Sequence, residues 1–109
     1  YINDPHIELN TKDNFNSDKI KNDLTAKIER TDYRFIKLVL KKGMNVQEYI
    51  DTKKSVYSTI DSLRDEYSIK TYGRLFNEIE NEIERKALIS KYSRFVIIEN
   101  ENEKQLIIK

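Results

Sequence analysis

Residues that could carry acid–base or metal chemistry are few and scattered in this sequence. The chain has one histidine, His6, and no cysteine, so it offers no thiolate nucleophile and no group of histidine or cysteine ligands. Two triplets, 51–53 and 84–86, match the acid-x-lysine fragment of some nucleases. That chemistry needs the triplet on a strand beside a second acid, so that a metal ion and the lysine share one phosphate. Both triplets are expected in helices or turns, so we predict a protein that is not an enzyme and holds no metal ion or cofactor.

Length and composition predict a single small folded domain. A chain of 109 residues, 38% of them hydrophobic, can bury one thin core. No apolar run approaches the roughly 18 residues of a membrane helix, and the start lacks a signal-peptide pattern. Without cysteine, a reducing cytoplasm is the expected location. Lys and Arg number 20 against 19 acidic residues, so the overall charge favours no class of partner and its distribution has to decide.

The first part of the chain is predicted to be an arm followed by helices. Residues 1–16 hold the only proline and are predicted to form an extended arm with a short strand, ahead of a domain over 17–109. Apolar residues then recur every four positions, which predicts a helix starting near Ser17. In the segment 33–42, apolar side chains cover most of the circumference. This pattern predicts the most buried helix of the domain, ended by Gly43.

The middle of the chain allows two alternatives. Asn45 and Glu48 fit a capping box, which predicts the start of another helix. In one alternative this helix stops near 51–52 and a separate helix runs over 53–66. In the other, a single helix spans 46–67, because apolar residues keep a near-heptad spacing along it. The sequence favours neither alternative.

The last part is predicted to be a long helix and a hairpin. An amphipathic pattern predicts a helix over 74–92, and two β-branched runs predict a C-terminal hairpin over 95–108. The expected fold is therefore a mainly helical α+β domain of three or four helices closed by a hairpin, similar to a winged helix. One apolar stripe of the long helix is a candidate surface for a homodimer or for a protein partner; it consists of Leu75, Ile79, Ile83 and Ala87.

The segment 53–66 has the pattern of a DNA-recognition helix. Its apolar side chains would face the core, while small polar groups could reach base edges and lysines could meet phosphates. Between residues 30 and 54, seven basic side chains stand against three acidic ones, a net charge of +4. We expect double-stranded DNA to be contacted in the groove by Lys53, Lys54, Ser55, Tyr57, Ser58 and Ser62, and at phosphates by Lys37, Lys41, Lys42 and Arg64.

The string over 55–69 resembles the recognition helix of DeoR-type winged-helix regulators. That family commonly has a Thr-Val-Tyr start, an Ile-Asp-x-Leu core and a Leu-Arg-x-Glu-Tyr-x-Ile end; this chain has SVY, IDSL and LRDEYSI at matching positions. The resemblance implies that the exposed face around Lys54 and Tyr57 enters the major groove. The segment 46–55 is shorter than the family's second helix and turn by about one turn, which a continuous helix would explain.

Two functions from different classes follow. The first is a non-catalytic regulator of transcription or replication, of a phage, a plasmid or another mobile element, that binds DNA and could pair as a homodimer. The second is a helical protein-interaction or inhibitor module that binds its partner through 74–92. A continuous helix over 46–67 would favour the second function, because it leaves no separate recognition helix.

Overall fold

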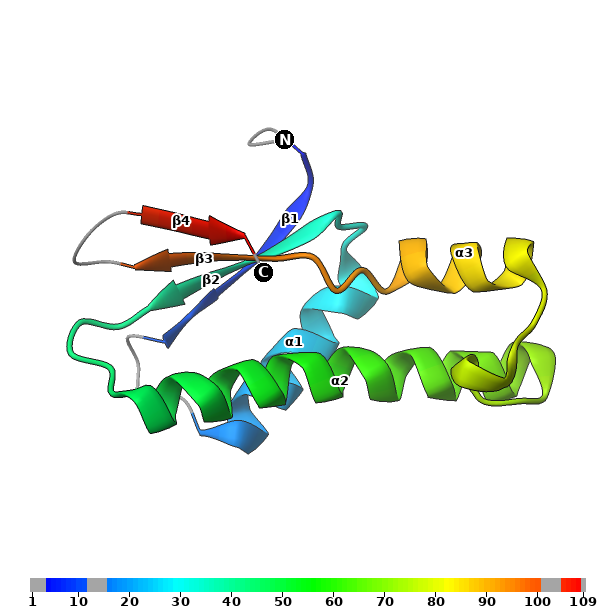
Figure 1. Cartoon of the computed structure of the whole chain (residues 1–109), viewed down its shortest axis with the longest axis horizontal. Coiled ribbons are helices and arrows are strands. Elements are labelled where there is room, and N and C mark those ends of the chain that lie inside the picture. The colour runs from blue at the N-terminus through cyan, green and yellow to red at the C-terminus, as the bar shows by residue number, and fades with distance from the viewer. Residues whose placement is uncertain (1–3, 12–15, 101–104, 109) are drawn as a thin grey trace.

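The computed structural model describes residues 4–11, 16–100 and 105–108, in which strands and helices alternate (Figure 1). The predicted class, a mainly helical α+β domain, is confirmed. In chain order the elements are β1 (His6–Asn10), α1 (Ser17–Arg30), β2 (Phe35–Leu40), α2 (Val46–Tyr72), the 3-10 helix η2 (Phe76–Glu78), α3 (Glu82–Lys91), β3 (Val96–Asn100) and β4 (Gln105–Ile108).

The strands form one sheet in the order β1-β2-β3-β4. β1 runs parallel to β2, with His6 opposite Phe35, and β2 runs parallel to β3, with Ile36 opposite Val96. Each parallel pair is joined through helices, as parallel strands require. β4 pairs antiparallel with β3. The turn of the hairpin predicted over 95–108 falls at 101–104, outside the described residues.

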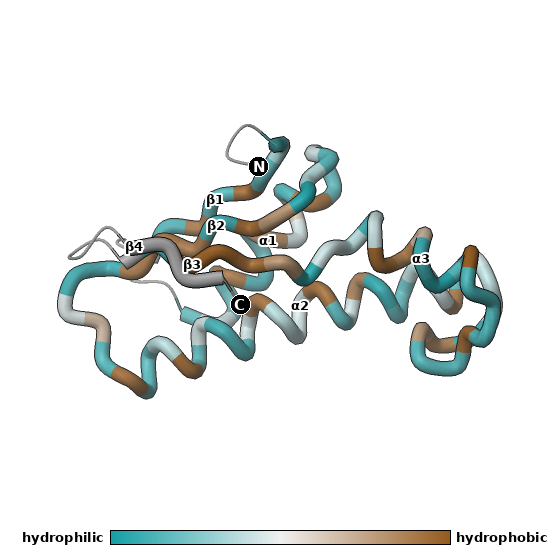
Figure 2. Tube along the Cα trace, turned by 45° about the horizontal axis from the view of Figure 1, so that its top comes forward, coloured by the Kyte–Doolittle hydropathy of each residue, from teal (hydrophilic) through white to brown (hydrophobic). Residues whose placement is uncertain are grey.

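The core lies between the sheet and two helices. α1 and α2 lie along the same face of the sheet (Figure 1), and hydrophobic residues follow β2 and β3 for most of their length (Figure 2). Burying each large apolar side chain contributes about 1.5–3 kcal/mol. The core is made of Ile7, Leu9, Ile20, Leu24, Ile28, Tyr33, Ile36, Leu38, Val56, Ile60, Val96 and Ile98.

The helix predicted over 33–42 is wrong, because this segment forms β2. Both faces of β2 are buried: Ile36 points into the core between sheet and helices, and Phe35 is buried on the opposite face. A central strand of a parallel sheet is apolar throughout and cannot be told from a buried helix by periodicity alone. Gly43 lies in the turn after the strand, at a φ of 77°, and does not end a helix.

α2 is one continuous helix. The predicted capping box is confirmed, since the Asn45 side chain accepts the Glu48 N–H at 2.8 Å and the Glu48 carboxylate accepts the Asn45 N–H at 3.2 Å. The helix does not break at 51–52; within it, the Thr52 side chain is buried and its hydroxyl donates to the Glu48 carbonyl at 2.8 Å. The alternative with two separate helices, which the winged helix requires, is therefore wrong: 53–66 is an internal part of α2, and β1, β2 and β3 form a parallel sheet.

The single helix predicted over 74–92 is also wrong. Gly73 ends α2 in the left-handed region, at a φ of 75°, and its N–H donates to the Ile69 carbonyl. The chain then forms η2 and starts again at α3, where the Asn81 side chain accepts the Glu84 N–H at 3.0 Å. Asparagine is a preferred N-cap, which explains a new helix at this point. Within the described part of the chain, no helix is long and apolar enough to cross a membrane.

Candidate protein-interaction surface

Five of the ten residues predicted to bind DNA line one groove along the N-terminal half of α2. The groove has a volume of about 740 Å³, and Tyr49 and Ile50 also line it. The Lys53 Nζ lies 5.3 Å from the centroid of the Tyr49 ring, and the Arg94 guanidinium lies 4.7 Å from that of Tyr57. This surface therefore combines aromatic rings with cations held over them. The five predicted residues in it are Lys53, Lys54, Ser55, Tyr57 and Ser58.

The other five predicted residues lie elsewhere and do not join this groove. Ser62 lines a separate groove between α1 and α2. Lys42 is exposed in the turn before α2. Lys41 lies near the start of α2, where its Nζ is 2.7 Å from the Glu48 carboxylate. The hydrogen bond from Lys41 is the main reason that the pKa of Glu48 is lowered. The predicted DNA-binding residues are thus spread over several surfaces.

Lys37 lies on the face of the sheet that α1 and α2 leave uncovered. Its Nζ is 3.1 Å from the Glu99 carboxylate on β3 and 3.7 Å from the Glu8 carboxylate on β1. The hydrogen bond to Glu99 and the charges of both carboxylates raise the pKa of Lys37. Two acidic neighbours balance its charge, so this lysine does not form the basic surface that a phosphate backbone needs.

Arg64 is buried, with 7% of its surface exposed. The prediction that it contacts a DNA phosphate is therefore wrong. Its Nε donates to the Tyr92 carbonyl at 2.9 Å, and its guanidinium lies 5.1 Å from the centroid of the Phe76 ring. Burial lowers the pKa of Arg64, and nearby Asp61 partly offsets this. The side chain joins α2 to the end of α3 and has a structural role.

Residues 64–92, here called the α3 arm, are held together by polar contacts and by the buried side chains of Ile79 and Leu88. The Asp65 carboxylate accepts the Phe76 N–H at 3.1 Å, and the Ser68 hydroxyl donates to the Arg74 carbonyl at 2.6 Å. Arg85 donates to the Ile79 carbonyl at 3.1 Å and lies over the Phe76 ring. Tyr92, at the end of the arm, packs against the main core cluster, whereas Ile79 and Leu88 are buried outside that cluster.

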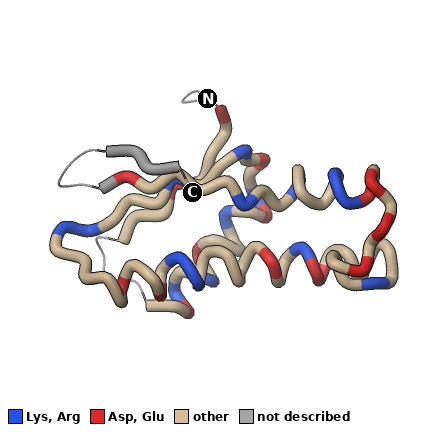
Figure 3. The backbone as a smooth tube through the Cα atoms, viewed as in Figure 1, with Lys and Arg blue, Asp and Glu red and all other residues tan. Residues whose placement is uncertain are grey.

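The four side chains of the predicted partner stripe are not all exposed in the structure. Ile79 is buried, with 2% of its surface exposed, and packs inside the α3 arm. Ile83 is 80% exposed, Leu75 is 40% exposed, and Ala87 is also exposed. Ile83 and Ala87 are four residues apart and share one face of α3. Acidic residues flank this apolar surface in the turn from η2 to α3 (Figure 3).

Ala87 also lines a groove between α3 and the starts of the strands. The groove has a volume of about 870 Å³ and is bordered by Ile89 and Phe95, two of the exposed large apolar side chains of the domain. At its floor the Tyr33 hydroxyl donates to the Ser93 carbonyl at 3.0 Å, and burial raises the pKa of Tyr33 to about 12. The apolar surface of α3 therefore continues from Ile83 toward the sheet.

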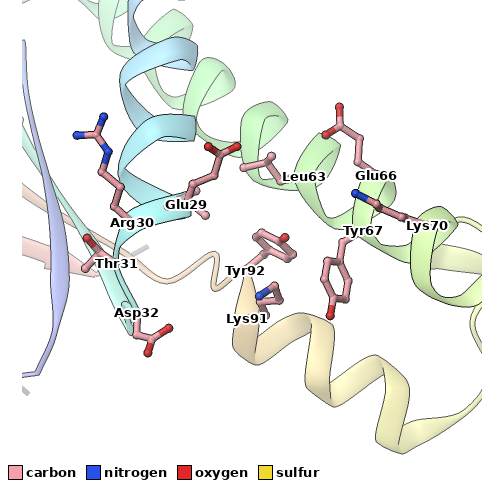
Figure 4. Close-up of a pocket in the computed structure, with 11 residues that line it drawn as sticks. Glu29, Arg30, Thr31, Asp32, Leu63, Glu66, Tyr67, Lys70, Lys91 and Tyr92 are labelled. Carbon is pink, nitrogen blue, oxygen red and sulfur yellow. The ribbon is translucent and has the colours of Figure 1, made fainter.

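A second cavity, of about 510 Å³, lies where the ends of α1 and α3 meet α2 (Figure 4). Its aromatic residues are Tyr67 and Tyr92, whose ring centroids are 5.9 Å apart in an edge-to-face arrangement. The Lys91 Nζ lies 5.1 Å from the centroid of Tyr67 and 5.7 Å from that of Tyr92. Burial, Tyr67 and the carboxylates of Glu29 and Glu66 raise the pKa of Tyr92, in that order of effect.

Among the described residues, the side chains that were candidates for acid–base or metal chemistry lie apart from one another. His6 is stacked on the Phe35 ring at 4.8 Å, and the two acid-x-lysine triplets lie in α2 and α3, away from any strand. The described residues contain no group of three or more histidine or acidic side chains that could hold a metal ion.

Sequence reasoning missed the Tyr67–Tyr92 pair and the structural role of Arg64. Tyr67 and Tyr92 are 25 positions apart, and only the reversal of the chain at Gly73 brings them together. The one available signal was the high number of tyrosines, seven, in a chain without tryptophan.

Comparison with known proteins adds no relative. No protein-family model, no curated protein and no solved structure matches this chain. The surfaces described above are therefore the basis for its functional interpretation.

Proposed function

We propose that this chain is a non-catalytic protein-binding module and that it binds its partner through α3. The observation that carries the proposal is Ile83, a large apolar side chain that is 80% exposed on a helix outside the main core. Exposed apolar patches with polar rims are typical of protein-interaction sites. Together with Ala87, Ile83 forms an apolar row that leads into the groove beside the sheet.

The continuous α2 helix supports this proposal over DNA recognition. A helix-turn-helix presents a separate second helix to the major groove. In this chain the candidate helix is the middle of a 27-residue helix whose Val56 and Ile60 side chains belong to the core. Such a helix cannot be presented on its own.

The proposal is tested by capture of a partner with matched variants. The biotinylated chain is incubated with an extract of its source cells, and bound proteins are identified by mass spectrometry. Ile83→Asp should abolish capture, because it replaces the most exposed apolar side chain of the row by a charge. Val46→Asp is the control, since Val46 is 74% exposed at the opposite end of α2. The proposal is contradicted if both variants capture the same proteins as the wild type.

A second copy of the chain is one of the partners that this test must separate. Light scattering of the purified chain gives its mass in the same buffer. A homodimer that Ile83→Asp dissociates and Val46→Asp leaves intact would identify the partner as a second copy.

Duplex DNA is the second candidate, favoured by the gathering of five predicted residues in the α2 groove. The expectation is micromolar binding that weakens steeply with salt, because phosphate contacts release counterions. Fluorescence anisotropy with random duplex DNA at two salt concentrations measures this. If Lys53→Ala with Lys54→Ala leaves the affinity unchanged, this candidate is contradicted.

A further inference from the structure

The cavity at the ends of α1 and α3 has the chemistry of a cation site. Two aromatic rings, Tyr67 and Tyr92, face the space that the Lys91 ammonium occupies, at 5.1 and 5.7 Å from their centroids. The face of an aromatic ring carries negative potential and attracts a cation within about 6 Å. The chain therefore shows, with its own lysine, that the two rings accept an ammonium group together (Figure 4).

The cavity lining carries three acidic and three basic residues. Glu29, Asp32 and Glu66 line it, and the negative charges of Glu29 and Glu66 act at the Tyr92 ring. The C-terminal ends of α1 and α3 also line it and carry partial negative charge. Arg30, Lys70 and Lys91 are the basic residues of the lining, and Figure 4 shows the side chains of Arg30 and Glu66 directed away from the two rings.

Lys91 is placed to be replaced by an incoming cation. The residue is exposed, and its Nζ contacts the two rings, Tyr67 and Tyr92, within the cavity. Cation–π contacts at exposed sites are weak, so a second cation of similar chemistry can compete with Lys91. Release of Lys91 into solvent would leave the rings and the carboxylates in place.

The cavity is also within reach of a partner bound to α3. Ile83, Ala87 and Lys91 follow one another at intervals of four residues, so they lie along one row of the helix. Eight residues of α-helix separate the first from the last, a distance of about 12 Å. A segment that packs on Ile83 can therefore place a long side chain over Tyr67 and Tyr92.

We infer that the Tyr67–Tyr92 cavity binds a lysine or arginine side chain of the protein partner, and that Lys91 occupies this cavity in the free chain. The inference rests on the proposed function for the identity of the macromolecule. The cavity itself can be tested without the partner.

The first experiment titrates the chain with tetramethylammonium chloride as the probe and follows the tyrosine ring signals by NMR. A titration with sodium chloride at equal ionic strength is the reference. We expect saturable shifts at Tyr67 and Tyr92. Lys91→Ala should bind the probe at least threefold more tightly, because the competing ammonium is gone. Tyr67→Leu should weaken binding at least fivefold, while Tyr67→Phe, which keeps the ring, should retain it. Tyr49→Leu is the control, because Tyr49 lies outside this cavity and its single ring is contacted by the Lys53 ammonium.

The outcomes separate the cavity from the proposed function. The inference is overturned if neither the wild type nor Lys91→Ala shows saturable shifts at the two tyrosines. It is also overturned if the probe binds but Tyr67→Leu captures the partner as well as the wild type does. If Ile83→Asp leaves partner capture unchanged while the probe still binds, the proposed function fails and the cation site remains.

Discussion

Proline at position 53 distinguishes one continuous α2 helix from two helices separated at 51–52. In the continuous helix, the N–H of Lys53 donates to the carbonyl of Tyr49. Proline removes this hydrogen bond, and its ring clashes with that carbonyl, at a cost of about 3 kcal/mol or more. If a second helix began at Lys53, proline would occupy its first position, where it is favoured. The two arrangements therefore predict opposite results for Lys53→Pro.

The expected shift is large enough to measure easily. Unfolding entropies near 2.1 cal/mol/K per residue give this 109-residue chain about 230 cal/mol/K, so a loss of 3 kcal/mol lowers Tm by about 13 °C. Thermal and urea unfolding followed by circular dichroism at 222 nm provide the assay. Lys53→Ala is the first control for Lys53→Pro. Both variants lose the cation–π contact with Tyr49, about 0.5–1 kcal/mol, but only Lys53→Pro introduces a proline.

Val46→Pro is the second control for Lys53→Pro. Val46 is the first residue of α2, and Asn45 before it is extended, with a ψ of 170°, which suits a residue that precedes proline. We expect this variant to unfold within about 1 kcal/mol of the wild type. The reasoning is refuted if Lys53→Pro is as stable as Lys53→Ala.

Two further predictions concern the cap of α2 and the buried tyrosine. Asn45→Ala should destabilise the chain by about 1 kcal/mol in urea unfolding, since it removes half of the capping box; stability equal to the wild type would contradict the cap. Burial raises the pKa of Tyr33 to about 12, from an ordinary value of 10.0. As pH rises, Tyr33 therefore loses its proton in the unfolded chain before it does so in the folded chain. The stability that neutral Tyr33 contributes is lost between pH 10 and pH 12. Tyr33→Phe should therefore be less stable than the wild type at pH 8, lacking the bond to Ser93, and the difference should shrink by pH 11; a constant difference would refute this.

Some helices and strands could be predicted from residues that lie close together in the sequence. The spacing of Ile20, Leu24 and Ile28 predicted α1, and the pair Asn45 and Glu48 predicted the start of α2. Both depend on residues within one or two turns of each other. A short strand predicted in the N-terminal segment is present as β1, but it is not part of an arm, because it pairs with β2 and buries Ile7 and Leu9 in the core.

Elements that depend on distant partners could not be predicted in this way. The apolar run of β2 suits a buried helix or a central strand, and its pairing with β1 and β3 decides the outcome. Thr52 is polar in the sequence, but it lies buried inside α2 because its hydroxyl donates to the backbone one turn earlier. Arg64 matches an exposed DNA contact by periodicity, and it is buried because η2 and α3 fold back over it.

The most direct test of the central claim places a photo-crosslinking amino acid, p-benzoylphenylalanine, at position 83 in the source cells. We expect a discrete adduct with a protein partner from this position, and no such adduct from position 46 at the far end of α2, which is also highly exposed. The same adducts from both positions, or none from position 83, would contradict the claim that α3 is the docking surface of this chain.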